Sequence, residues 1–337
     1  MKKEKIGLLL INLGTPASTN VKDIRNYLKE FLMDPRVINI PYWKRYLLVN
    51  GIIAPFRAPK VQKEYQKLWL PEGSPLKVIS ESLTNKLQRQ LYSDGYIVRL
   101  AMRYGHPNIE SQLEELKEQN IDKLILLPLF PQYASATAGT ALEEAYRIIG
   151  KQKVVYNTRG ISYFHQHPLY IQSLKEKVEK DINTHQPDHI LFSFHGLPVS
   201  QIEEIGKDCD CSDNTRVCDH DKPYCYKSAC YRTAKLLVEA LDIKPDKYSI
   251  AFQSRLGKTP WIEPYTEDQI TRLAKAGVKK LHVIAPSFVV DCLETTIEIG
   301  EQYRDQFIAL GGSSFTWSES LNDDTHWVEN LAHIINE

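Results

Sequence analysis

The sequence predicts an α/β protein made of two similar Rossmann-like domains, each with a mostly parallel four-stranded sheet flanked by helices. Short apolar runs, rich in Leu, Ile and Val, alternate with longer amphipathic segments through all 337 residues. This alternation is typical of a doubly wound fold whose strands are buried on both faces. Four such runs lie in each half of the chain, although no sequence repeat accompanies them.

The predicted strands share a continuous apolar stretch of about four to eight residues. They are Ile6–Leu13, Ile97–Met102, Lys123–Phe130, Val154–Asn157, His189–Phe194, Tyr248–Gln253, Lys280–Ala285 and Ser314–Trp317. The predicted helices share apolar residues at helical spacing. They are Val21–Met33, Leu83–Leu91, Asn108–Glu118, Leu169–Asn183, Tyr226–Leu241, Glu267–Ala276, Leu293–Arg304 and Asn322–Ile335.

The domain boundary is expected near the middle of the chain. We place the first domain at residues 1–160 and the second at residues 161–321, with a cysteine-rich insertion at 207–230. The last segment, 322–337, reads as a helix that packs back on the first domain. No long Pro-, Ser- or Gly-rich linker separates the two halves.

Composition excludes several classes of protein. Lys and Arg number 42, as do Asp and Glu, so the formal net charge is zero and no nucleic-acid partner is expected. No apolar run reaches the roughly 18 residues that a membrane span needs. The run Ile6–Leu13 leads into a turn-like Gly14-Thr15-Pro16 rather than a cleavage site, which favours a buried strand over a signal peptide. We therefore expect a cytoplasmic protein.

Polar residues follow the predicted strands, where ligands bind in open α/β sheets. His195 comes directly after the run Ile190–Phe194. A lone histidine of this kind is more often hydrogen-bonded into a loop than catalytic. A second group of residues strengthens the catalytic interpretation.

That second group opens the helix after the last long strand. Asp291 and Glu294 have the spacing of a capping-box variant, which is the structural interpretation. However, Glu298 and Glu301 continue the same face without an interspersed Lys or Arg. A carboxylate row offers oxygen ligands for a hydrated divalent cation, an imidazole adds a ligand suited to Fe(II), and both can act as general bases.

Several short motifs, in order along most of the chain, carry a family resemblance. Ser193-Phe194-His195-Gly196-Leu197-Pro198 resembles the histidine motif of the ferrochelatase family. The other matching segments are Leu10–Pro16, Gly73–Leu76, Met102–Tyr104, Leu129–Tyr133, Phe252–Arg255 with Trp261 and Pro264, and Pro286–Thr295. The resemblance implies a chelatase-type fold and an enzyme that inserts Fe(2+) into protoporphyrin IX to form protoheme, the last step of heme biosynthesis, with release of two protons.

The resemblance also assigns roles to individual residues. It implies that His195 and Glu294 are the catalytic pair that meets the iron, with Asp291 and Glu298 as the acidic positions continuing from it. It implies substrate binding by a second set, namely Arg57 and Arg103 toward the propionates, and Ile38, Tyr133, Trp261 and Ser254 along the porphyrin. Without the resemblance, core packing is the favoured interpretation of Tyr133 and Trp261.

Five of the six cysteines form one dense cluster: Cys209, Cys211, Cys218, Cys225 and Cys230. Such a cluster in a large chain favours a metal site over a disulfide scaffold. Four thiolates can bind a [2Fe–2S] cluster or zinc, and free thiols are the third interpretation. The resemblance to bacterial ferrochelatases with an internal cysteine-rich insertion favours the [2Fe–2S] cluster, with Cys230 as the candidate spare.

The segment Tyr42–Phe56 is apolar and aromatic with Lys44 and Arg45 included. One interpretation is a lid over the substrate, and the other is a lip that touches the bilayer. The second makes peripheral contact with the inner membrane an expected property of a cytoplasmic enzyme. Both interpretations can hold together.

The sequence leaves three alternatives to an iron chelatase open. They are a cobalt chelatase of the same fold, a non-catalytic porphyrin or iron carrier, and an iron–sulfur sensor on an α/β scaffold. A nicotinamide enzyme is disfavoured because no G-x-G-x-x-G follows the first strand. Likeness to enzymes of the Gram-negative type favours protoporphyrin IX over coproporphyrin III.

Overall fold

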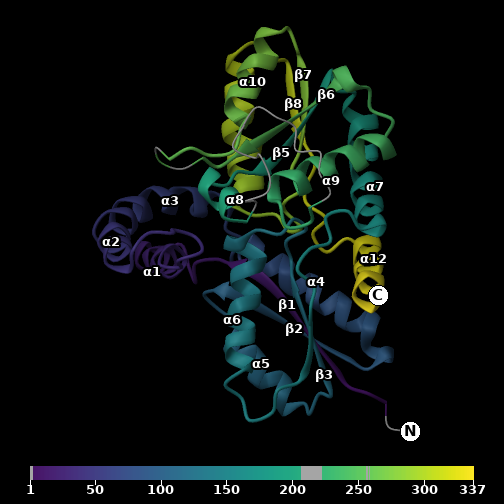
Figure 1. Cartoon of the computed structure of the whole chain (residues 1–337). Coiled ribbons are helices and arrows are strands. Elements are labelled where there is room, and N and C mark those ends of the chain that lie inside the picture. The colour runs from purple at the N-terminus through teal and green to yellow at the C-terminus, as the bar shows by residue number, and fades with distance from the viewer. Residues whose placement is uncertain (1–2, 206–221, 256, 258) are drawn as a thin grey trace. The chain divides into compact units, whose positions relative to one another are not determined.

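The computed structural model describes residues 3–205, 222–255, 257 and 259–337 (Figure 1). These residues form two compact units. The N-terminal unit comprises Met1–Phe130, Ala134–Ser162 and Asp323–Ala332. The C-terminal unit comprises Pro131–Tyr133, Tyr163–Asn322 and His333–Glu337.

Each unit is built on a parallel four-stranded sheet. The N-terminal sheet has the order β2-β1-β3-β4, with β1 at Ile6–Gly14, β2 at Tyr96–Tyr104, β3 at Lys123–Pro128 and β4 at Asn157–Gly160. The C-terminal sheet has the order β6-β5-β7-β8, with β5 at His189–His195, β6 at Tyr248–Gln253, β7 at Lys280–Ile284 and β8 at Ser314–Trp317. The second order repeats the first four strands later, which confirms the prediction of two similar α/β domains.

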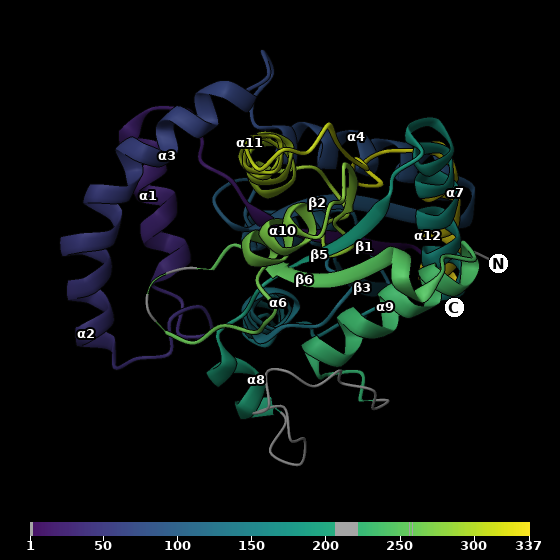
Figure 2. The ribbon, with the colours of Figure 1, turned by 90° about the horizontal axis from the view of Figure 1, so that it is seen from above.

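The following helices of the N-terminal unit fall between its strands. They are α1 (Val21–Leu32), α2 (Tyr42–Leu47), the π-helix η1 (Leu48–Ile53), α3 (Ala54–Leu68), α4 (Pro75–Leu91), the 3₁₀ turn η2 (Tyr92–Asp94), α5 (Ile109–Glu118), the π-helix η3 (Ser135–Gly139) and α6 (Thr140–Ile149). Figures 1 and 2 both show α1, α2 and α3 grouped to one side of the sheet β1–β3. That group carries the apolar segment 42–56.

The helices of the C-terminal unit follow the same plan. They are α7 (Pro168–His185), α8 (Val199–Ile205), α9 (Tyr226–Ala240), the 3₁₀ turn η4 (Pro245–Lys247), α10 (Thr266–Lys275), the π-helix η5 (Glu294–Tyr303) and α11 (Arg304–Ala309). The last helix, α12 (Thr325–Asn336), spans the final residues of both units.

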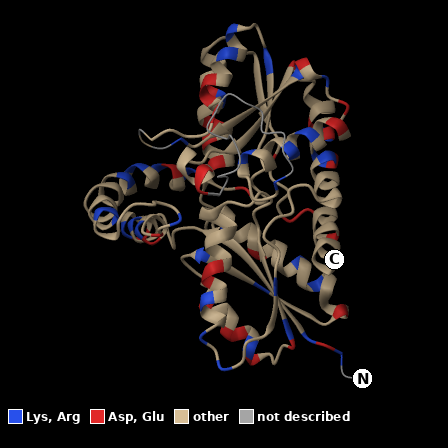
Figure 3. Ribbon diagram, in the orientation of Figure 1, with Lys and Arg blue, Asp and Glu red and all other residues tan. Residues whose placement is uncertain are grey.

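The cores are the buried faces of the sheets and of the helices that cover them. Leu9, Ile11 and Leu126 of the N-terminal sheet pack with residues of α5 and α6. Leu191 and Val283 of the C-terminal sheet pack with residues of α10, η5 and α11. Charged residues lie mainly on the helices and loops (Figure 3), as burial of strands rich in Leu, Ile and Val requires.

Some predicted boundaries were wrong. The fourth strand begins at Asn157 rather than Val154, because Asn157 pairs with Lys123 of β3 while Val154 and Val155 stay exposed. The helix predicted from Leu83 begins at Pro75, a residue suited to the first helical turn. Helices α3 and α6 were not predicted at all.

Gly14 ends β1 in a conformation that only glycine adopts easily. Its φ is +122°, and a Cβ there would lie 1.8 Å from the carbonyl oxygen of Tyr104 on the neighbouring strand. The Gly14-Thr15-Pro16 turn therefore depends on close contact between backbones.

Candidate active site

His195 is the last residue of β5, and its peptide is fixed by hydrogen bonds. The His195 carbonyl accepts a hydrogen bond of 2.7 Å from the hydroxyl of Tyr226, and the N–H of Gly196 donates one of 2.8 Å to the carbonyl of Gln253. The imidazole Nδ1 lies 2.6 Å from the carbonyl of Gly196. Because a carbonyl can only accept, this contact assigns the proton to Nδ1 and leaves the lone pair on Nε2.

Two aromatic rings flank this histidine. The centroid of the imidazole lies 6.4 Å from Trp261 and 6.2 Å from Phe288. Trp261 is 9% exposed and also covers Gly196, where a Cβ would come within 3.2 Å of the indole and 2.8 Å of the Gln253 carbonyl. The glycine of the histidine motif is thus required by close packing.

Glu294 is the first residue of the π-helix η5, which replaces the regular α-helix predicted for this segment. π-helical turns are uncommon and occur frequently at functional sites. The wider turn changes the spacing of the acidic row, so that its members no longer share one face at α-helical intervals. Glu294 is half-buried, and its carbonyl receives a 3.4 Å contact from the amide of Gln253.

Glu298 is engaged by donors within its own unit. It accepts hydrogen bonds from the Ser254 N–H (2.9 Å), the Ser254 hydroxyl (2.6 Å) and the Tyr303 hydroxyl (2.7 Å). Ser254 has a φ of +67°, a strained value for a residue other than glycine. Glu298 therefore holds the turn after β6, and Ser254 faces this carboxylate.

Asp291 is likewise surrounded by donors. Its carboxylate accepts hydrogen bonds from the Thr295 hydroxyl (2.9 Å), the Ser320 N–H (3.0 Å) and the Asn322 amide (2.7 Å). These contacts connect the start of η5 to the chain after β8. Among Asp291, Glu294 and Glu298, Glu294 is the one whose carboxylate accepts the fewest such hydrogen bonds.

Gln253 connects the histidine strand with the acidic helix. It is 1% exposed and accepts a hydrogen bond of 2.6 Å from the hydroxyl of Ser193. Its amide reaches the Glu298 carboxylate at 3.5 Å. The residue lies in a segment that carried the family resemblance, but its bridging role was not predicted.

Cys292 lies two residues before Glu294 and is 8% exposed. Burial, followed by the nearby carboxylate of Glu294, raises the pKa of the Cys292 thiol well above its usual range. The side chain is therefore a neutral thiol in a packed position.

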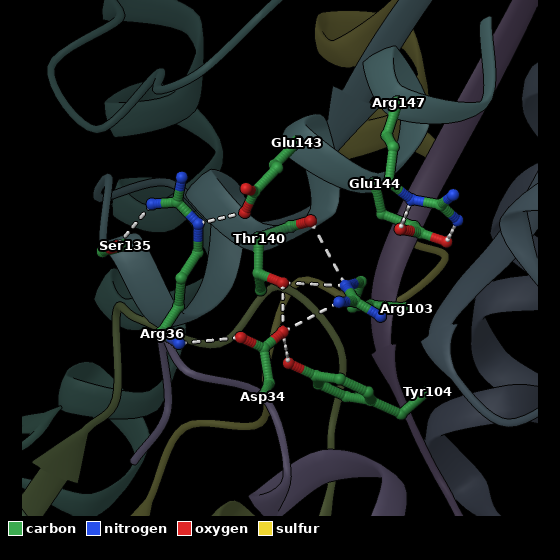
Figure 4. Close-up of polar contacts among 9 residues, drawn as sticks. All are labelled: Asp34, Arg36, Arg103, Tyr104, Ser135, Thr140, Glu143, Glu144 and Arg147. Atoms are coloured by element: carbon green, nitrogen blue, oxygen red, sulfur yellow. Dashed lines mark hydrogen bonds and ion pairs between the residues drawn. The ribbon is translucent and has the colours of Figure 1, made fainter. Parts of the chain in front are cut away.

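Arg103, at the end of β2 in the N-terminal unit, belongs to a separate network (Figure 4). Its guanidinium donates to Asp34 (2.8 Å) and to the hydroxyl of Thr140 (2.8 Å). Asp34 also accepts hydrogen bonds from Tyr104 (2.8 Å), Thr140 (2.6 Å) and the N–H of Arg36 (2.8 Å). The network joins the end of α1 to β2 and α6.

Asp34 is ionised within this network. Its side chain is 4% exposed, and burial alone would raise its pKa. The hydrogen bonds from Thr140, Arg36 and Tyr104, together with the charge of Arg103, outweigh burial and hold the Asp34 pKa below its ordinary value. Sequence reasoning missed Asp34, and the Asp-Pro step after α1 predicts no more than a turn.

Arg57 and Ile38 belong to the same unit and are both half-buried. Arg57 lies on α3 and makes no hydrogen bond or ion pair with any residue that the structure describes. Ile38 follows α1, and its carbonyl accepts a hydrogen bond of 3.0 Å from Arg45. The two arginines predicted to bind substrate thus differ: the guanidinium of Arg103 is bound to Asp34 and Thr140, and that of Arg57 has no partner among the described residues.

Tyr133 belongs to the C-terminal unit and is half-buried. Its ring meets Tyr224 edge-on, with centroids 5.0 Å apart. The adjacent Gln132 donates to the hydroxyl of Thr233 on α9 at 3.0 Å. Tyr133 therefore packs against a residue just before α9, while its neighbour Gln132 is bound to the middle of that helix.

Two of the five clustered cysteines lie within the described residues. Cys225 precedes α9, Cys230 lies inside it, and both are buried free thiols. Cys209, Cys211 and Cys218 lie outside the described residues. Within the described parts of the chain, no group of three or more His, Cys, Asp or Glu side chains could hold a metal ion.

The segment 42–56 exposes large apolar side chains on α2, η1 and α3. They are Tyr42, Trp43, Tyr46, Leu47, Ile52 and Phe56, each more than half exposed. Among the helices that the structure describes, none is both long and apolar enough to cross a bilayer.

Known proteins resemble this chain both in sequence and in fold. A family model described as ferrochelatase matches residues 5–337. Proteins named ferrochelatase from Coxiella burnetii and Legionella pneumophila are each 42% identical over 331 residues, covering 97% and 98% of this chain and 92% and 98% of their own. The sirohydrochlorin chelatase SirB from Bacillus subtilis subspecies spizizenii, in complex with cobalt, aligns with a TM-score of 0.56 over 99% of this chain and 94% of its own. At 11% identity, that likeness concerns the fold alone.

Proposed function

This chain belongs to the ferrochelatase family and is an enzyme that inserts ferrous iron into protoporphyrin, and we propose that His195 and Glu294 are the residues that carry the reaction. The observation that carries this proposal is the position of His195. It stands at the carboxyl end of a central strand with its peptide fixed and its Nε2 lone pair available.

The reaction exchanges one cation for two protons. Fe(2+) enters the ring as two pyrrole N–H bonds break, and the four nitrogens then bind the metal with no change in its oxidation state. The protein must therefore supply bases for the two protons and ligands that replace the water of the ion. A neutral imidazole and a carboxylate suit both tasks.

His195 fits the role of base or iron ligand through Nε2, because Nδ1 is committed to the Gly196 carbonyl. Glu294 fits the acidic role better than its neighbours. Asp291 and Glu298 each accept at least three hydrogen bonds that stabilise turns of the C-terminal unit. We assign to these two acids the support of the site and a contribution to its negative potential.

The test is an anaerobic assay of heme formation from Fe(2+) and protoporphyrin IX, followed in the Soret and Q bands. His195→Ala and Glu294→Gln should both lose metallation while still binding porphyrin. His326→Ala removes an exposed histidine of α12 and is the matched control. Wild-type rates in both site variants would overturn the assignment, and porphyrin binding without turnover in the wild type would favour a carrier.

We propose further that Arg57 pairs with a propionate of the porphyrin. Its guanidinium has no partner among the described residues, whereas Arg103 is tied to Asp34 and Thr140. Ile38, Tyr133, Trp261 and Ser254 are proposed as lesser substrate contacts. Trp261 has the firmest support, since its ring lies beside His195.

For the cysteines, we propose a [2Fe–2S] cluster held by four of the five. Cys225 suits a ligand because it stands at the N-terminus of α9, where the helix dipole favours a thiolate. Cys230 suits it less, because burial raises the pKa of its thiol well above the usual range. A cluster supplies one-electron chemistry, which metal insertion does not use. Iron and acid-labile sulfide in equal amounts would support it, and zinc or neither would contradict it.

We also propose that the exposed apolar side chains of 42–56 touch a membrane surface. The segment from α2 to α3, residues 42–68, holds six basic residues and one acidic residue, and its blue ribbon is visible in Figure 3. Exposed aromatic rings with basic neighbours suit anionic lipid. Co-sedimentation with anionic vesicles should fall in a Trp43→Ser/Phe56→Ser variant. Equal sedimentation, or none in the wild type, would leave the lid interpretation.

We place the enzyme in the cytoplasm, with this contact at the inner membrane, and without a nucleic-acid partner. The zero formal net charge supports the last point.

A further inference from the structure

We propose that Tyr226 is a positioning residue for His195, fixing the peptide that follows the histidine and so the direction of its imidazole. The inference rests on the proposed role of His195 and goes beyond it, because Tyr226 lies on a different element. It stands 31 positions later in the chain, at the first residue of α9.

The peptide bond between His195 and Gly196 is held at both edges. On one edge, the His195 carbonyl accepts the 2.7 Å hydrogen bond from Tyr226. On the other, the Gly196 N–H donates at 2.8 Å to the Gln253 carbonyl of β6. Loss of either partner frees rotation of a peptide whose next carbonyl holds Nδ1 of the imidazole.

Ser287 completes the arrangement. Its hydroxyl lies 3.2 Å from the Tyr226 hydroxyl and 3.4 Å from the His195 N–H, which points to it. Tyr226 and Ser287 together therefore engage both main-chain polar groups of His195. A tyrosine placed for packing alone would not need this orientation of its hydroxyl.

The side chain of Tyr226 is buried, with 6% of the residue exposed. Because the ring is buried, phenylalanine would keep the packing and remove the donor alone. The substitution Tyr226→Phe thus isolates the hydrogen bond.

The expected result for Tyr226→Phe is a fall in kcat of about 10- to 100-fold, the range in which a small misplacement of a reacting group acts. The KM for protoporphyrin IX should stay within about twofold of wild type, because the substitution does not change Trp261, the residue proposed to contact porphyrin. The KM for Fe(2+) should rise, since Nε2 no longer points consistently at the metal. If Tyr226 had a purely structural role, the substitution would lower the amount of folded enzyme, and kcat and both KM values of the folded molecules would stay as in the wild type.

Tyr170→Phe is the matched control. Tyr170 is 1% exposed in the same unit and also donates a 2.7 Å hydrogen bond to a carbonyl, that of Pro286. Loss of this hydrogen bond in Tyr170→Phe should lower the melting temperature as much as Tyr226→Phe does, and kcat per folded molecule should be retained. Equal kinetic loss in both variants would overturn the proposal.

If Tyr226→Phe folds poorly, Ser287→Ala tests the same arrangement and should lower kcat in the same direction. The histidine signal of His195, assigned in the ¹H–¹⁵N spectrum by its absence from His195→Ala, should shift or broaden in Tyr226→Phe. An unchanged signal with wild-type kinetics, while His195→Ala is inactive, would reject the role of Tyr226 alone. Activity in His195→Ala would instead reject the proposed function.

Discussion

The two sheets of this enzyme have the same strand order, but their first strands end in different residues. Both have the strand order in which the first strand lies between the second and third. In both, the chain after the third strand passes through a π-helix, η3 in one unit and η5 in the other, before an α-helix. Yet the first strand ends in Gly14 in the N-terminal unit and in His195 in the C-terminal unit.

The two units also differ in the surroundings of one acidic residue each. Asp34 of the N-terminal unit is neutralised by Arg103 and by hydroxyl and N–H donors. Glu294 of the C-terminal unit has no ion pair with any described residue, and its described contacts are to Cys292 and, through its carbonyl, to Gln253. The same strand order therefore carries different side chains in the two units: a hydrogen-bonded network in the N-terminal unit, and in the C-terminal unit the residues that we propose for the reaction.

The largest expected effect separates Glu294 from Glu298. Glu294→Gln should lower kcat by about 100- to 10,000-fold, the usual contribution of a positioned base, and leave the free energy of unfolding unchanged. Glu298→Gln should weaken the turn at Ser254 and lower stability, with a smaller loss of kcat. Steady-state kinetics and chemical denaturation of both variants check this, and the reverse pattern would exchange their roles.

Asp34→Asn should give the opposite outcome to Glu294→Gln. It leaves the half-buried guanidinium of Arg103 without its counter-charge and should lower the free energy of unfolding by about 3 kcal/mol. Activity per folded molecule should stay near wild type. Glu143→Gln, which removes the exposed partner of Arg36, is the control and should cost less than about 1 kcal/mol. A catalytic defect larger than the stability defect would break the comparison.

Acid should destabilise the C-terminal unit before Asp34 is affected. Burial lowers the pKa of His282 to about 4, with Asp181 opposing and His185 adding to the shift. The unfolded chain therefore binds more protons between pH 6.5 and 4, and stability falls as pH decreases through that window, by roughly 3 kcal/mol. The Asp34 contribution is lost at lower pH, as the pH falls from the ordinary value of 3.8 toward the depressed pKa of this carboxyl.

Denaturation curves at pH 7 and pH 4.5 measure this difference. His282→Gln removes the titrating group that contacts Thr316 and Ser318, so it should be less stable at pH 7 but less sensitive to acid. His189, whose pKa burial also lowers to about 4, should supply part of the remaining dependence. An unchanged acid sensitivity in His282→Gln would assign the effect to other groups.

The smallest expected effect concerns Arg57. Arg57→Ala should raise the KM for protoporphyrin IX by about tenfold, the loss of one charge-assisted contact, with kcat retained. Lys60→Ala removes an exposed charge from the same helix and should leave KM near wild type. Equal effects would indicate general attraction of an anionic substrate rather than a defined contact.

The sheets were largely predictable, because buried parallel strands are continuous apolar runs that composition alone marks. The fourth strand was misplaced because Val154 and Val155 look like a strand but are exposed, while the paired residues from Asn157 are polar. The lengths of η1, η3 and η5 could not be predicted. A π-helix has no distinct residue pattern and arises from packing of the finished unit.

Reactive side chains such as His195 and Glu294 can be singled out from the sequence as candidates, and their roles stay predictions. Residues that act by holding others were missed. Tyr226 reads as the start of an amphipathic helix, and Asp34 reads as part of a turn. Their partners lie far along the chain, so the sequence gives no sign of them.

The central claim is that metal chemistry belongs to the strand ends of the C-terminal unit. Titration of the porphyrin-free enzyme with Co(2+), whose visible spectrum reports its ligands, tests this most directly. The same absorption component should be lost in His195→Ala and in Glu294→Gln, and Asp34→Asn should retain it. All of these variants keep the cysteines, so a signal from cysteine-bound Co(2+) should not differ among them. Retention of every component in both site variants, or its loss in Asp34→Asn alone, would contradict the claim.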